Sequence, residues 1–139
     1  MKLFSLVFIL SLAVTGAARA DIIPPCPAPA DVTVLPFDQV PIGLQKALHD
    51  KAGDLSPPPN PASPAPAGRR KLPAATYGLF VWNRSTRWVI ATQHGSRGYD
   101  APVYVFDLAA DGKRVGLTTE KRASGKTVCA VAKALVAAQ

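Results

Sequence analysis

The distribution of proline limits most strongly what this chain can fold into. Six of its 14 prolines lie between Pro57 and Pro66, and four more lie between Pro24 and Pro29. Proline has no backbone N–H and a fixed φ, so neither stretch can form a regular helix or an inner strand. The Pro/Ala-rich segment 54–71 is therefore predicted to be a linker, with extended polyproline II as its default conformation.

The first 20 residues have the pattern of a cleaved export signal. Lys2 supplies a positive charge, residues 3–14 are apolar apart from two serines, and residues 18–20 read Ala-Arg-Ala, as at a signal peptidase site. The apolar run is shorter than the roughly 20 residues that a transmembrane helix needs. We therefore expect signal peptide 1–20 to be removed and the mature protein to be periplasmic or secreted, without a transmembrane segment. An uncleaved membrane anchor is the alternative.

The two cysteines are expected to form a disulfide bond. Cys26 and Cys129 both follow the export signal, and an even number of cysteines in an exported chain favours pairing. In the chain-entropy description, closing so long a loop stabilises a fold by up to about 4–5 kcal/mol. Reactive thiols are the alternative, but neither cysteine lies in a CxxC motif, and Cys129 lies among apolar residues.

The pattern after the linker predicts an α+β core domain over residues 72–139. Runs rich in aromatic and β-branched residues predict four strands, at 75–82, 87–93, 102–108 and 113–119. The pair Asp111-Gly112 is a strong hairpin signal, so we expect a four-stranded antiparallel meander. A helix over 126–138 carries an apolar stripe and is expected to cover one face of that meander.

The region before the linker, residues 21–53, is predicted to contain an extended segment and one helix. Pro41 suits a first helical turn, Gly53 suits a C-terminal cap, and the apolar residues between them recur at helical spacing. These features predict a helix over 41–52. Residues 32–35 have the composition of a short edge strand.

Charge and composition exclude some classes of protein and partner. The chain has 16 Lys+Arg against 9 Asp+Glu, a formal charge of +7. With 48% hydrophobic and 18% charged residues, it is not a charged, fully disordered chain. Basic residues interleaved with aromatic ones superficially suit single-stranded nucleic acid. Export argues against that partner, so no nucleic acid is expected, and one domain of this size is predicted to be a monomer.

Aromatic and basic residues gather around the first predicted hairpin and the loop that follows the second strand. If the second face of the meander is open, these residues would form a surface for a protein or a cell-wall polymer. The candidate binding residues are Trp82, Arg84, Arg87, Trp88, Arg97 and Tyr99.

The loop after the second strand also holds the best candidates for catalysis. His94 has the chemistry of a general base, Asp100 that of its orienting group and Ser96 that of a nucleophile. No Gly-x-Ser-x-Gly elbow surrounds Ser96, and nearness in sequence does not create triad geometry. The cysteines and histidines match no metal-ligand spacing. We therefore expect a non-catalytic binding module without a cofactor or metal, with a small hydrolase as the alternative.

Overall fold

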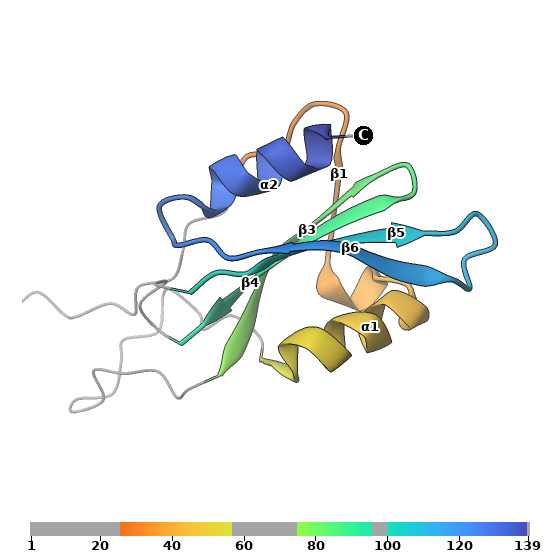
Figure 1. Cartoon of the computed structure of the whole chain (residues 1–139), viewed down its shortest axis with the longest axis horizontal. Coiled ribbons are helices and arrows are strands. Elements are labelled where there is room, and N and C mark those ends of the chain that lie inside the picture. Colours follow the sequence, from red (N-terminus) through yellow and green to blue (C-terminus); the bar gives the residue numbers. More distant parts are fainter. Residues whose placement is uncertain (1–25, 57–74, 96–99, 139) are drawn as a thin grey trace, which may run out of the picture.

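The computed structural model describes residues 26–56, 75–95 and 100–138, which form an α+β fold (Figure 1). These residues contain six strands, two α-helices and one short 3₁₀-helix. In chain order the elements are β1 (Thr33–Leu35), η1 (Phe37–Gln39), α1 (Ile42–Ala52), β2 (Leu55–Ser56), β3 (Thr76–Arg84), β4 (Arg87–His94), β5 (Val103–Leu108), β6 (Val115–Lys121) and α2 (Val128–Ala137). The predicted α+β class is confirmed.

The sheet is larger than the predicted four-stranded meander. Its strand order is β1-β3-β4-β5-β6, and β2 also pairs with β3, so the described residues form six strands rather than four. β1 runs antiparallel along the end of β3, and β2 runs parallel to its first two residues. The two short strands share one edge of β3 because this nine-residue strand would otherwise present a long unpaired row of backbone groups.

Helix α2 covers one face of the sheet (Figure 1). Its buried residues Val128, Ala132 and Val136 recur at helical spacing and pack against side chains of β3, β4 and β5. Trp82 and Phe80 stack in this cluster, with ring centroids 4.5 Å apart. The small residues on α2 let the helix lie close to the sheet.

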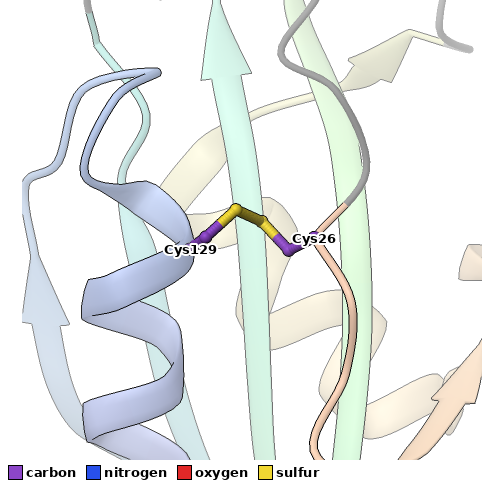
Figure 2. Close-up of a disulfide and its surroundings, with 2 residues drawn as sticks. All are labelled: Cys26 and Cys129. Carbon is purple, nitrogen blue, oxygen red and sulfur yellow. A yellow bond between two sulfur atoms is a disulfide. The ribbon is translucent and has the colours of Figure 1, made fainter.

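A disulfide bond fixes the first turn of α2 to the N-terminal segment. Cys26 and Cys129 are bonded, with Cα atoms 5.5 Å apart and a separation of 103 positions in the chain. Figure 2 shows the bond passing from the helix to the extended segment that precedes β1. The predicted pairing is confirmed, and it holds two distant parts of the chain against the same sheet face.

Helix α1 covers the opposite face, which the sequence interpretation had treated as potentially open. Leu44 and Leu48 are buried against Val81, Ile90 and Phe106, each of which alternates along its strand with a residue that faces α2. The sheet therefore lies between two helices (Figure 1).

A close approach at Gly78 seats η1 on the α1 side of the sheet. A Cβ atom at this position would lie only 2.5 Å from the ring of Phe37. The ring thus packs directly on the backbone of β3, which only glycine permits.

Three predicted features lie wholly or mostly outside the described residues. They are the signal peptide 1–20, most of the linker 54–71 and the middle of the loop after β4. Within the described ranges, no helix is long and apolar enough to cross a membrane.

Candidate binding site at one end of the sheet

The two tryptophans proposed as binding residues lie in the interior. Trp82 is fully buried on the α2 side, and Trp88 is 8% exposed on the α1 side. They lie on opposite faces because the register partner of Trp88 is Asn83, the chain neighbour of Trp82, and successive residues of a strand point to opposite faces. Both indole rings serve the core and offer no joint surface to a partner.

Arg84 and Arg87 hold the last turn of α2. The Nη1 group of Arg84 donates to the carbonyl of Val136 at 3.2 Å, and the Nη1 group of Arg87 donates to the carbonyl of Ala138. The last carbonyls of a helix have no partners within the helix and carry partial negative charge. Cationic donors there satisfy these groups and stabilise the helix. The two arginines therefore act as a clamp within the fold.

Acidic residues hold each arginine of this clamp in place. Asp31 lies 2.8 Å from Nε of Arg84. Asp107 accepts from Nε and Nη2 of Arg87 at 3.2 and 3.4 Å, and from the Thr118 hydroxyl at 2.8 Å. The hydrogen bond from Arg87 holds the pKa of the Asp107 carboxyl below its usual range, against the opposing effect of burial, and Thr118 lowers it further. The carboxylate is therefore charged and fully engaged.

A shallow hollow lies beside this clamp, at the end of the β5–β6 hairpin. Its volume is about 510 Å³, and its lining includes Thr86, Asp107 and Arg114. Arg114 is paired with Asp111 at 3.7 Å, and Asp107 is bound as described above. The hollow thus holds an engaged carboxylate and an arginine that is 84% exposed and only loosely paired, whereas the opposite end of the sheet brings several polar side chains into mutual contact.

At that opposite end, four polar side chains form a row across four neighbouring chain segments. Thr76 on β3 is the register partner of His94 on β4, and His94 pairs in turn with Asp100. Asp100 forms an ion pair with Arg122, the residue after β6. Register partners share one face of a sheet, so this polar row of Thr76, His94, Asp100 and Arg122 is continuous.

The polar row lies on the α1 side of the sheet. Trp88 and Ile90 of β4 pack on that side, and the alternation of the strand carries Thr92 and His94 to the same face. Figure 1 shows this end of β4 extending past α1. The helix therefore leaves the row uncovered.

Contacts within the row divide it into two pairs. The Thr76 hydroxyl lies 3.2 Å from Nδ1 of His94. The Nη1 group of Arg122 donates to both carboxylate oxygens of Asp100, at 3.0 and 2.9 Å. His94 and Asp100 meet through their backbones, where the His94 N–H donates to the Asp100 carbonyl at 2.9 Å. The Asp100 carboxylate thus orients Arg122 rather than the imidazole.

Tyr104 and Glu120 extend the polar row toward the centre of the sheet. They are register partners on β5 and β6. Burial, and then the negative charge of Glu120, raise the pKa of the Tyr104 phenol, while Thr92 and Arg122 oppose that rise. Glu120 and Arg122 therefore act on the pKa of this phenol in opposite directions.

Three predicted site residues, Ser96, Arg97 and Tyr99, lie outside the described residues. The sequence interpretation did not select Thr76, Glu120 or Arg122. It ended the last strand at residue 119, whereas β6 continues to Lys121 and carries Glu120 onto the same face as Tyr104. Extending the alternation of that strand by three residues, to 122, would have placed Glu120 and Arg122 together on one face.

Within the described ranges, no group of three His, Cys, Asp or Glu side chains is placed to hold a metal ion. Comparisons with protein-family models, curated proteins and solved structures found no match to this chain.

Proposed function

We propose that this protein is a non-catalytic binding module of the periplasm or the extracellular space, and that it recognises a protein or a cell-wall polymer through the polar row. One observation carries this proposal. At the clamp end of the sheet, Arg84 and Arg87 donate hydrogen bonds within the fold. In the polar row, His94 and Arg122 are exposed and keep ring or guanidinium nitrogens that have no partner among the described residues.

The scaffold beneath the row is rigid, as a binding surface requires. The members of the row stand at the ends of β3, β4, β5 and β6, whose central parts are packed between two helices. The Cys26–Cys129 bond adds a covalent restraint, and such bonds persist in oxidising compartments outside the cytoplasm. Export by the predicted signal peptide agrees with this location.

The geometry supports binding better than hydrolysis. The hydrolase alternative pairs His94 with Asp100, so the Asp100 carboxylate would have to accept from the imidazole. The neighbouring carboxylate, Asp100, is engaged by Arg122, and Nδ1 of His94 faces the Thr76 hydroxyl. The hydrolase alternative would require these two pairs to exchange partners.

Site-specific cross-linking tests the proposal. A photo-reactive residue at position 94 should capture a partner from envelope extract, and the same residue at Lys46 should not. Lys46 is the matched control because it is exposed on α1 and forms an ordinary surface pair with Asp50. Equal capture at both positions would overturn the polar row as the binding site.

Paired variants separate binding from catalysis. In pull-downs of the partner that cross-linking identifies, made with proteins that carry no photo-reactive residue, Thr76→Ala with His94→Ala should lose that partner, while Lys46→Ala with Asp50→Ala should keep it. Circular dichroism of each variant checks that the fold is intact. A hydrolytic activity of the protein that disappears in His94→Ala would instead establish the hydrolase alternative.

A further inference from the structure

We infer that Arg122 binds a carboxylate of a partner peptide through its Nε and Nη2 groups. The inference rests on the proposed function, because it gives the chemistry of the partner for the same polar row. The partner would be a protein segment rather than a polysaccharide, and Arg122 would contact one carboxylate on that segment.

The guanidinium of Arg122 is held in place but largely unused. Both of its hydrogen bonds to Asp100 come from Nη1, and within the described ranges Nε and Nη2 have no hydrogen-bond partner. The side chain is 73% exposed. Arginine presents its donors in a fixed planar fork, and the edge formed by Nε and Nη2 matches the two oxygens of a carboxylate. Asp100 therefore orients the fork without filling it.

The guanidinium itself, and not a surrounding excess of positive charge, would select an acidic group at this edge. Lys121 is the register partner of Val103, which packs on the α2 side, so Lys121 points away from the face of Arg122. Glu120 and Asp100 lie on the face of Arg122. A bound carboxylate would therefore depend on the two charge-assisted hydrogen bonds of the arginine fork.

The described surface suits a peptide better than a sugar chain. Every aromatic side chain of the described residues is buried or half-buried, so none offers an open ring on which a sugar could stack. The polar row instead offers a hydroxyl, an imidazole, a carboxylate and a guanidinium. Adjacent strands lie about 4.8 Å apart, so these groups can contact successive polar groups of an extended backbone crossing the strands.

A nuclear magnetic resonance titration of the full mature protein tests the inference with three pools of random hexapeptides. The first pool has a free C-terminal carboxylate and no acidic residues. The second has one glutamate and an amidated C-terminus, and the third is amidated and has no acid. At least one of the first two pools should shift the Arg122 Nε–H resonance, and the third should not. The responding pool identifies the source of the carboxylate.

Substitutions at two arginines decide whether the fork itself is responsible. Arg122→Gln should weaken binding of the responding pool by about tenfold or more, since a charge-assisted pair is lost. Arg122→Lys keeps the charge but removes the fork, so its affinity should lie between that of the unmodified protein and that of Arg122→Gln. Arg114→Gln removes an equally charged, exposed arginine that is also paired with an aspartate, and it should bind like the unmodified protein.

Four results would overturn the inference. They are equal binding of the acid-free pool, equal weakening by Arg114→Gln, full affinity in Arg122→Gln, and binding of an acidic oligosaccharide such as oligogalacturonate without binding of either acidic peptide pool. If the partner that cross-linking identifies is lost from pull-downs of the Thr76/His94 double variant but kept in those of Arg122→Gln, the inference fails and the proposed function stands. If the partner is kept in both, both fail.

Discussion

Two arginine–aspartate pairs, one at each end of the sheet, have the same chemistry and different surroundings. Arg87 and Asp107 join β4 to β5 on the α2 side, and the Arg87 side chain is 18% exposed. Arg122 and Asp100 lie at the opposite end on the α1 side, where the Arg122 side chain is 73% exposed. The first pair lies beneath the end of a helix, and no described element covers the second.

The number of donors in use separates the two pairs. Nε, Nη1 and Nη2 of Arg87 all donate within the fold, to Asp107 and to the Ala138 carbonyl. Arg122 uses Nη1 alone among the described residues. An ion pair seen in a structure therefore indicates neither stability nor function by itself. What matters is which donors remain and whether a ligand can reach them.

Removing the disulfide bond should have the largest effect on the clamp end. Cys26→Ser with Cys129→Ser leaves α2 held by its core packing and by the clamp at its last turn, and should lower the free energy of unfolding by about 2–4 kcal/mol. Urea unfolding of this variant and of the oxidised protein measures the loss. Identical curves would show that the arginine clamp and the core hold the helix without the bond.

Arg87→Gln should come next. It removes contacts to Asp107 and to the end of α2, and charged hydrogen bonds of this kind contribute about 1–3 kcal/mol. Arg114→Gln is the control, because its side chain is 84% exposed. Its change should stay within about 0.5 kcal/mol. Equal losses in the two variants would contradict the distinction between a clamp and a surface pair.

Acid should weaken the clamp end through Asp107. The pKa of Asp107 is lowered in the folded state, so its carboxylate contributes stability above its unfolded pKa of about 3.9. That contribution is lost as pH falls through the folded-state pKa. Thermal melts between pH 2 and pH 6, about two units on each side of the unfolded value, should show a shallower acid decline in Asp107→Asn.

Arg122→Gln should have the smallest effect on stability. An exposed ion pair contributes about 0–1 kcal/mol, so urea unfolding should change little. A loss of unfolding free energy as large as that of Arg87→Gln would mean that Arg122 stabilises the fold. Arg122 would then not be available to a partner.

Much of the fold followed from local patterns in the sequence. The runs at 75–82 and 87–93 correspond to β3 and β4, and the apolar stripe after residue 126 corresponds to α2. The pairing of the two cysteines followed from their number and the predicted compartment. These features depend on short spacings or on parity, which a single sequence contains.

The candidate site depended on long-range register, which local patterns do not contain. Trp88 looked like a surface aromatic only while the α1 side was taken to be open, whereas Trp82 lies beneath α2 on the other face. Arg87 looked available until the end of α2, 51 residues away, was placed beside it. The polar row joins four segments between Thr76 and Arg122, and only the strand pairing brings them together.

Chemical modification of arginine tests most directly the claim that Arg122 is available to a partner while Arg87 is committed to the fold. A dicarbonyl reagent such as phenylglyoxal condenses with accessible guanidinium groups, and mass spectrometry locates each product. In the folded protein, Arg122 and Arg114 should react rapidly and Arg87 slowly. Adding the responding peptide pool should then protect Arg122 and leave Arg114 reactive. Slow modification of Arg122 at the rate of Arg87, or equal protection of Arg122 and Arg114, would contradict the account.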